Sequence, residues 1–301
     1  MPKTTAELLD LLNLQETSPD VFSGPQPDTI MQRTYGGQVM AQAIVAAYQT
    51  LPKDRRMHSM HAFFLRPGNS HVPITYKADR LRDGRTFTTR RVDASQEVKE
   101  GAEKEIFGMS ASFHKAEESR LNHQDELPSS TPPPEECPSL VDVMNAQYGE
   151  HPMWHEWDAL DVRYAGDSAG NGSPRIPQIP VHSHKSHMRV WIKTQDKLPD
   201  DYAIHQAVLA YASDLTLLSV TTVPHSVAFM STKIQTASID HAMWFHRPAR
   251  ADEWLLYDMI SPSASYALGY GTGRLFQDGQ LIASCAQEGL VREVENRAIL
   301  S

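Results

Sequence analysis

The chain contains one internal repeat, and this repeat restricts the possible folds more than any other feature. The stretch MHSMHAFFLRP at 57–67 matches SIDHAMWFHRP at 238–248 when their Arg-Pro pairs are aligned. Both stretches predict long strands, because they are aromatic and alternating and end where proline cannot continue a ladder. An apolar helix is expected before each strand, over 36–49 in the first copy. In the second copy the stretch 205–220, HQAVLAYASDLTLLSV, predicts a helix that runs into a strand.

The repeating unit is therefore a helix followed by four or more antiparallel strands. Both helices are apolar on nearly every side, which indicates that they are buried all round. A curved sheet wrapped around one central helix explains this pattern, and two such sheets can pair edge to edge and remove exposed edges. We expect an α+β fold with an N-terminal unit at 1–115 and a C-terminal unit at 187–301. The segment 116–186 is rich in Pro, Ser and Gly, so we expect a linker with at most a short helix or two.

Composition and charge limit the class of protein. A formal net charge of −9 and a pI near 5.8 argue against a nucleic-acid partner, which usually meets a basic surface. The first residues, MPKTTAELLDLLNLQ, predict an amphipathic helix with acidic side chains rather than a signal peptide. No window approaches the roughly 18 uninterrupted apolar residues of a membrane span. We therefore expect a soluble cytoplasmic protein without a membrane span.

The sequence gives little support for a metal or a cofactor. His182, His184 and His187 have metal-like spacing, but no cysteine and few carboxylates accompany them. Surface histidines and no bound metal are the expectation. The chain has no phosphate-binding Walker loop, no dinucleotide fingerprint after a strand and no Gly-x-Ser-x-Gly elbow. We expect no cofactor.

Four residues are candidates for binding a substrate, each with a structural alternative. Gly36 and Gly37 open a buried helix, where a ligand can approach backbone N–H groups or where the helix start simply packs tightly. His58 is a candidate general base or a hydrogen-bonded structural histidine. Arg66 begins a run of basic residues that extends to Arg91. That run fits an anionic ligand such as a nucleotide phosphate, or a solvated strand face.

The two copies differ in their polar residues. The helix of the first copy has no acid, whereas that of the second contains Asp214 among Leu, Val and Ala, where an ionised carboxylate needs polar partners. Only the second copy has Ser238 at the start of its long strand and Gln287 in its last strand. Because the sheet wraps the helix, Asp214, Ser238 and Gln287 are expected to converge, which gives one active half and one scaffold half. The alternative is an acid at a helix end with two unrelated strand residues.

With these motifs, the sequence resembles the acyl-CoA thioesterase II (TesB-like) family of double hot-dog proteins. The similarity includes YGGQVMAQAI, FFLRPG, LRDGRTFTTRRV, YASDLTLL, IDHAMWFHRP and AQEGLVR, and covers most of the chain except the region around 116–186. The resemblance implies a catalytic Asp on the second central helix, a Thr or Ser before the IDH strand and a Gln in the QEG stretch. These fall on Asp214, Ser238 and Gln287. Many members have Thr where this chain has Ser238, and the hydroxyl is retained.

The expected function is hydrolysis of acyl-CoA thioesters by a water molecule that Asp214 deprotonates and that Ser238 and Gln287 hydrogen-bond. A backbone N–H near the helix start, or the Gln287 amide, is expected to face the developing oxyanion. The acyl chain is expected in an apolar slot between the units, and the resemblance implies a homo-oligomer, a dimer or a tetramer. One alternative is a hot-dog enoyl-CoA hydratase, but such enzymes use an Asp and a His a few residues apart, and no His follows Asp214 closely. The other is a non-catalytic acyl-CoA-binding protein, although no DNA-binding or partner domain is visible.

Overall fold

The computed structural model describes residues 1–99, 101–169, 186–225 and 233–294. The described α-helices are α1 (Thr5–Leu11), α2 (Gly36–Gln49), α3 (Leu140–Tyr148) and α4 (Tyr202–Thr216), and the 3-10 helices are η1 (Pro134–Glu136), η2 (Pro152–His155) and η3 (Leu217–His225). The strands are β1 (Gln15–Ser18), β2 (Val21–Gly24), β3 (Arg55–Phe64), β4 (Ile74–Asp83), β5 (Phe87–Lys99), β6 (Ala102–Lys115), β7 (Leu160–Asp167), β8 (His187–Thr194), β9 (Ile234–Ser238), β10 (Asp240–Phe245), β11 (Leu255–Ser265), β12 (Leu268–Gln277) and β13 (Gln280–Glu293).

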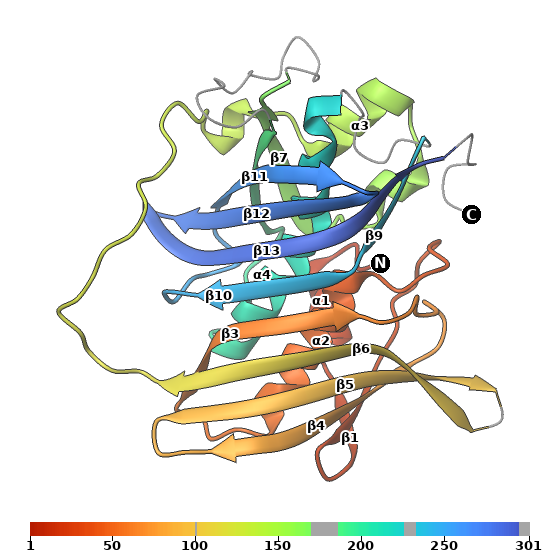
Figure 1. The fold of residues 1–301 in the computed structure, drawn as a ribbon, viewed down its shortest axis with the longest axis vertical. Helices are drawn as coiled ribbons and strands as arrows, with labels where there is room; N and C mark the ends of the chain where they lie inside the picture. The colour runs from red at the N-terminus through yellow and green to blue at the C-terminus, as the bar shows by residue number, and fades with distance from the viewer. Residues whose placement is uncertain (100, 170–185, 226–232, 295–301) are drawn as a thin grey trace.

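These strands form one antiparallel sheet, with α2 and α4 side by side on one face (Figure 1). The strand order is β1-β2-β4-β5-β6-β3-β10-β13-β12-β11-β8-β7, and β9 pairs with β13 off this path. Strands β1 to β6 surround α2, and β7 to β13 surround α4. The two halves join where β3 pairs with β10, with His61 opposite Ala242. The predicted duplicated α+β architecture and the edge-to-edge pairing of its two sheets are therefore confirmed.

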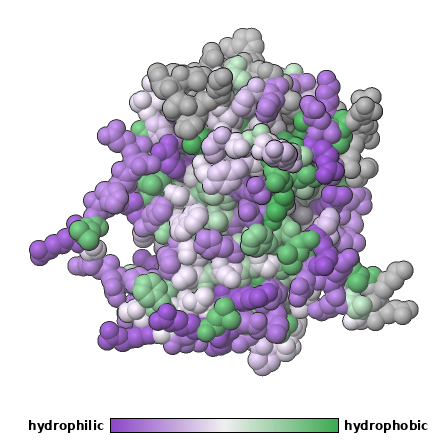
Figure 2. Space-filling model, viewed as in Figure 1, coloured by the Kyte–Doolittle hydropathy of each residue, from purple (hydrophilic) through white to green (hydrophobic). Residues whose placement is uncertain are grey.

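The central helices are buried because sheet and helices enclose them together. In α2, the residues from Gly37 to Ala47 are all buried. Tyr35 at the start of α2 donates a hydrogen bond from its hydroxyl to the carbonyl of Tyr211 on α4, at 2.7 Å. The opposite face of the sheet, shown in Figure 2, is largely hydrophilic with scattered apolar residues. This is the alternation expected of an antiparallel sheet with one face on the core and one toward solvent.

Two local predictions were wrong. The stretch after α4 forms the buried 3-10 helix η3, not a strand, since a short apolar run fits a strand and a buried helix equally well. The described part of the segment 116–186 has more regular structure than we expected of a linker. It contains η1, α3 and η2, and its strand β7 pairs with β8. A strand at this position covers an otherwise open sheet edge, and the surrounding Pro and Gly residues hid its signal.

The region Tyr202–His225, which is α4 followed by η3, is long and apolar enough to cross a membrane by length and composition. It is not an uninterrupted apolar run, because polar residues such as Asp214 lie within it. In the structure, 83% of the most apolar window is buried inside the protein. Its hydropathy is explained by its place as the central helix of the C-terminal half.

Candidate active site

Three polar side chains from separate elements of the C-terminal half meet at the end of α4. The amide nitrogen of Gln287 on β13 donates to Asp214 Oδ1 at 2.6 Å and to Ser238 Oγ at 2.8 Å. Ser238 Oγ in turn donates to Asp214 Oδ1 at 3.2 Å. The amide nitrogen must face the acid because an ionised carboxylate only accepts. The side chains that we expected to converge thus form one closed hydrogen-bonded group.

Gln287 on β13 lies close to α4 because the neighbouring strand, β12, has a glycine beside it. Gln287 pairs with Gly271 of β12, and Ser238 at the end of β9 pairs with Gly289. A Cβ atom on Gly271 would lie only 3.0 Å from the carbonyl oxygen of Leu217, just past the end of α4. A larger residue at this position would push the helix away from the sheet. The glycine therefore keeps Asp214 within reach of β13.

The start of α2 forms the other side of the site. Tyr35, the residue before α2, makes no capping hydrogen bond with its side chain, and the backbone N–H of Gly37 donates to the Asp214 carboxylate instead. A Cβ on Gly36 would lie 2.7 Å from Asp214 Oδ2, and one on Gly37 would lie 2.5 Å from the carbonyl oxygen of Tyr211. Asp214 thus places a carboxylate at the N-terminus of α2, where the helix dipole favours an anion. Gly36 leaves room for this carboxylate, and Gly37 allows the two helices to pack closely.

Burial raises the pKa of the Asp214 carboxyl above its usual value. Hydrogen bonds from Gln287, Ser238 and Gly37 act in the opposite direction, but they do not cancel the effect of burial. The Asp214 side chain is only 4% exposed. A carboxylate whose pKa is raised toward neutrality is a stronger base than one in water, which suits general base catalysis.

His241 of β10 lies next to Asp214 without forming an ion pair. Its Nδ1 is 3.9 Å from Asp214 Oδ1, and burial lowers the pKa of the imidazole to about 3, so the ring is neutral. Ser213 Oγ donates to the carbonyl of Ala210, and it therefore accepts from His241 Nε2–H at 3.0 Å. This fixes the tautomer with an unprotonated Nδ1. His241 supplies no positive charge to the site.

A cavity of about 250 Å³ opens beside this group. Asp214 and Ser238 line it, together with residues from the segment before α2, from α4 and η3, and from β9. The remaining lining residues are Met31, Arg33, Thr34, Tyr35, Gly36, Trp157, Leu215, Leu218, Ser219, Thr222, Ile234, Thr236 and Ala237. The carbonyl oxygen of the Gln287 side chain is buried and accepts no hydrogen bond in the described part of the chain. The site thus combines a base, an unused acceptor and space for a ligand.

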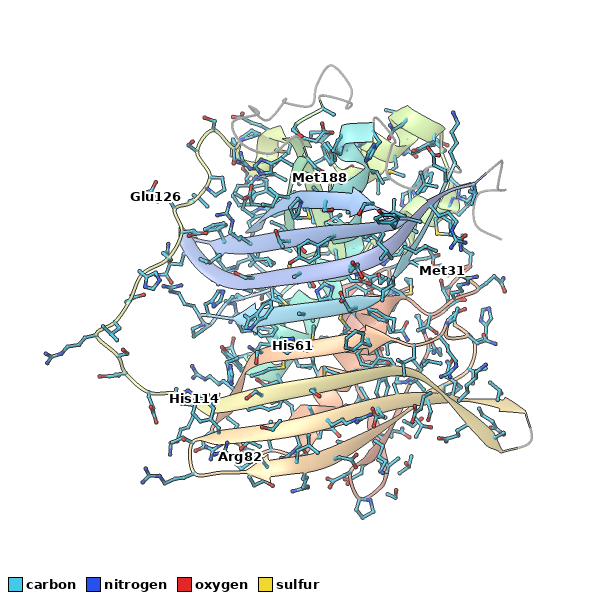
Figure 3. All side chains as sticks on the ribbon, viewed as in Figure 1. Met31, His61, Arg82, His114, Glu126 and Met188 are labelled. Carbon is cyan, nitrogen blue, oxygen red and sulfur yellow. The ribbon has the colours of Figure 1, made fainter. Side chains whose placement is uncertain are left out.

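His58 and Arg66 do not line this cavity, and we no longer assign them to the site. His58 hydrogen-bonds with Ser112 at 2.8 Å, and Arg66 donates to the carbonyl of Glu105 at 2.8 Å. Figure 3 shows Met31, which lines the cavity, on one side of the molecule and Arg82 on the opposite side. For His58 and Arg66, the structural alternatives fit better: a hydrogen-bonded histidine and a solvated arginine.

The basic run that ends at Arg91 is also largely satisfied within the protein. Arg80 pairs with Asp20 at 2.8 Å, and Arg91 with Asp93 at 3.0 Å. The Arg90 guanidinium is buried and contacts Asp83 at 2.6 Å. Of the two interpretations left open for this hairpin, an anion site and a solvated strand face, the second fits better, because acidic partners already pair with these three arginines.

Sequence reasoning missed two residues at the cavity. Arg33 is exposed, and the described residues offer its guanidinium no ion pair or hydrogen bond. Its closeness to the YGGQ motif was the only signal. Trp157 comes from the supposed linker and packs edge to face on Tyr35, with ring centroids 5.6 Å apart. No pattern in a Pro- and Gly-rich segment marks such a residue.

No group of three or more His, Cys, Asp and Glu side chains placed to hold a metal occurs within residues 1–99, 101–169, 186–225 and 233–294. His182 and His184 lie outside these residues. His187 hydrogen-bonds through Nε2 with Asp258 at 2.6 Å.

Comparison with known proteins identifies the family. A model described as acyl-CoA thioesterase N-terminal domain matches residues 25–114, and one described as acyl-CoA thioesterase matches residues 177–290. The chain is 36% identical to acyl-coenzyme A thioesterase 8 of Homo sapiens over 298 residues, which cover 94% of this chain and 88% of that protein. A crystal structure of the acyl-CoA thioesterase II TesB2 from Mycobacterium marinum is 37% identical, with a TM-score of 0.76, over 95% of this chain and 98% of that one. The chain belongs to the acyl-CoA thioesterase II family.

The architecture of this thioesterase also agrees with its relatives. A protein with a hot-dog fold from Alicyclobacillus acidocaldarius is only 18% identical but superposes with a TM-score of 0.72, over 95% of this chain and 98% of that one. The predicted double hot-dog fold is confirmed, and so is the enzyme class, a thioester hydrolase, at the level of the family. The two family models leave residues 115–176 between them unmatched.

Proposed function

We propose that this thioesterase hydrolyses acyl-CoA thioesters to a free acid and CoA by direct attack of a water molecule that Asp214 deprotonates. One observation carries the proposal. A carboxylate with a raised pKa is hydrogen-bonded to an amide and a hydroxyl at the wall of a cavity large enough for the reacting part of a ligand. Groups of this kind orient and activate water in general base catalysis.

The roles of the three side chains follow from their donors and acceptors. Gln287 uses its amide nitrogen on both Asp214 and Ser238, and its side chain is fully buried and does not line the cavity, so it holds these two groups in position rather than contacting the water. Asp214, which lines the cavity, takes one hydrogen of the water as its oxygen attacks the thioester carbon. Ser238 keeps the carboxylate in line. Gln287 is thereby removed as a donor to the oxyanion, a role that sequence analysis left open between it and the helix start.

The first turn of α2 is the better source of oxyanion stabilisation. The first N–H groups of a helix have no partner within the helix, and their dipole favours a developing negative charge. Gly37 gives its N–H to Asp214, which leaves the N–H of Gly36 as the nearest candidate. When the tetrahedral intermediate collapses, the carbon–sulfur bond breaks. The proton held by Asp214 then passes to the CoA thiolate and regenerates the base.

Arg33 is the residue that we assign to the CoA half of the substrate. The guanidinium is exposed at the cavity that contains Asp214 and has no acidic partner in the described residues. Arginine binds phosphate through paired donors, and an arginine that no carboxylate neutralises retains its full charge for this role. CoA carries its phosphates at the end remote from the thioester, so Arg33 marks the direction in which that end leaves the site.

The test is thiol release from acyl-CoA by the purified protein, three variants of the site and one control variant. We expect Asp214→Asn to lower kcat/KM by roughly 100- to 10,000-fold, the usual contribution of a general base. Gln287→Ala and Ser238→Ala should lower it by smaller factors. His58→Ala is the matched control, a polar residue away from the cavity, and should retain activity. Near-normal turnover of folded Asp214→Asn would reject the proposal.

The geometry does not favour the hydratase alternative. A hydratase of this fold needs a histidine that shares the substrate cavity with the acid, whereas His241 is fully buried behind Asp214 and bonded to Ser213. It does not line the cavity. The thiol assay separates the alternatives, because neither hydration nor simple binding releases a thiol.

A further inference from the structure

A second, mainly apolar cavity of about 160 Å³ lies next to the cavity that contains Asp214. Its walls include Leu140, Val141 and Met144 of α3 and Leu160 and Val162 of β7. Two further residues, Trp157 and Leu215, line both cavities, so the cavities meet at these side chains. Leu215 directly follows Asp214, and the junction is therefore one residue away from the proposed base.

We propose that this second cavity receives the far end of the acyl chain, and that Trp157 at the junction controls which chain lengths the enzyme accepts. The inference rests on the proposed function, since it starts from a thioester held at Asp214. A substrate bound there has two arms that must leave in different directions. One is an alkyl chain and the other is the polar, anionic CoA moiety.

Charge decides which arm enters the second cavity. Its charged lining residues are Arg163, Asp158 and Asp161. Asp161 already neutralises Arg163 at 2.6 Å, and Asp158 pairs with the half-exposed ring of His155 at 2.9 Å. This rim therefore offers no free cation to a phosphate, and its carboxylates repel one. The apolar walls suit the alkyl arm, while Arg33, which has no acidic partner among the described residues, lies at the first cavity.

The junction is held in place by packing rather than by a loose side chain. The Trp157 ring meets Tyr35 edge to face, at 5.6 Å and 76°, and Tyr35 meets Tyr211 in the same way, at 5.1 Å and 81°. Met144, Met153 and Trp154 form a small second core that supports the wall on the other side. Such aromatic contacts restrict ring movement. A fixed ring at the junction can discriminate by shape.

The origin of these walls has a consequence for specificity. Elements α3, η2 and β7 all lie between the regions that the two family models match, 25–114 and 177–290. The catalytic group lies on α4, β9 and β13, within the C-terminal match. The segment between the units thus determines the chain-length preference, whereas the C-terminal unit carries the catalytic residues. Changes in that segment alter the substrate without touching Asp214.

The experiment compares alkyl chains of two lengths in a variant whose second cavity is filled. Val141→Trp places a large ring in that cavity, and Val141→Phe is a milder version in case the first does not fold. Gln147→Trp is the matched control, because Gln147 lies on the exposed side of the same helix and lines neither cavity. Titration calorimetry with S-butyl-CoA and S-dodecyl-CoA, two thioethers that cannot be hydrolysed, gives the ratio of their dissociation constants. Hydrolysis of butyryl-CoA and dodecanoyl-CoA gives the corresponding ratio of kcat/KM.

Each buried methylene strengthens binding by about fourfold, so losing even two of them costs more than tenfold. We expect the preference for dodecyl over butyl to fall at least tenfold in Val141→Trp or Val141→Phe, and to stay within twofold in Gln147→Trp. Trp157→Ala should move the best-bound chain to a greater length. Unchanged ratios in the Val141 variants, or an unchanged profile in Trp157→Ala, would overturn the inference. Because binding of the thioethers needs no catalysis, failure of the proposed hydrolysis would appear separately, as wild-type protein that releases no thiol.

Discussion

The substitution Gly36→Ala tests whether the position of the Asp214 carboxylate is essential. The new Cβ would lie 2.7 Å from Asp214 Oδ2 and 2.9 Å from two ring atoms of Phe64, whereas ordinary contact begins at 3.4 Å. The carboxylate oxygen must therefore move by about 0.7 Å. A 1 Å misplacement costs on the order of 100-fold in rate. We expect kcat/KM to fall roughly 10- to 100-fold, which is about 1.4–2.7 kcal/mol of transition-state stabilisation.

The same substitution should affect stability less than activity. Overpacking costs about 1–3 kcal/mol, and replacing glycine by alanine recovers about 0.4–1 kcal/mol by restricting the unfolded chain. Urea unfolding should show a loss of about 1–2 kcal/mol, and thiol release measures the activity. Gly108→Ala is the control, since its Cβ meets only the Asp93 carboxylate, at 3.2 Å, on the outer face of the sheet. Gly36→Ala protein that keeps activity within twofold of wild type would refute the reasoning.

Three further predictions concern the side chains of Ser238, Asp214 and Asp258. Ser238→Thr should retain most activity because the hydroxyl remains, whereas Ser238→Ala should lower kcat/KM roughly 10- to 100-fold; equal rates for both variants would contradict this. Because burial raises the pKa of Asp214, the activity of wild type should decline as pH falls through a value above 3.8, and the stabilising effect of the protonated carboxyl should be lost as pH rises through that raised pKa. The difference between the free energies of unfolding of Asp214→Asn and wild type should therefore shift in favour of Asp214→Asn as pH rises. A difference that stays constant across pH would contradict this. Burial raises the pKa of Asp258, but hydrogen bonds from His187 and Arg189 outweigh it and hold the pKa well below its usual value; Asp258→Asn should cost about 3–5 kcal/mol in urea unfolding, and a loss under 1 kcal/mol would show that the buried charges are not interdependent.

The duplicated fold was predictable because its signals repeat. Two buried helices and two strands ending in Arg-Pro restrict the chain to a helix wrapped by a sheet, twice. The meeting of Asp214, Ser238 and Gln287 was predictable for a different reason. That only one copy carries these polar residues, and that an acid in an apolar helix needs partners, suggested the meeting, and the resemblance to the acyl-CoA thioesterase II family favoured it over the alternative of unrelated residues.

The errors arose where local sequence does not determine the outcome. The apolar residues after α4 satisfy a strand and a 3-10 helix alike, and the sheet decides between them. The count of arginines up to Arg91 stopped short of Asp93, two residues further along the same strand, and ignored Asp20, which the pairing of β2 with β4 brings close to Arg80. Arg33 and Trp157 belong to no periodic pattern. Their positions depend on how the segment between the units packs against α4.

Direct attack by water is most directly tested by single turnover in water labelled with oxygen-18, followed by mass spectrometry of the acid and of the protein. The account predicts one labelled oxygen in the released acid, an unlabelled Asp214 and no acyl group on Ser238 at any time point. Label in the Asp214 carboxylate, or a transient acyl ester on Ser238, would show that a side chain rather than water attacks the thioester.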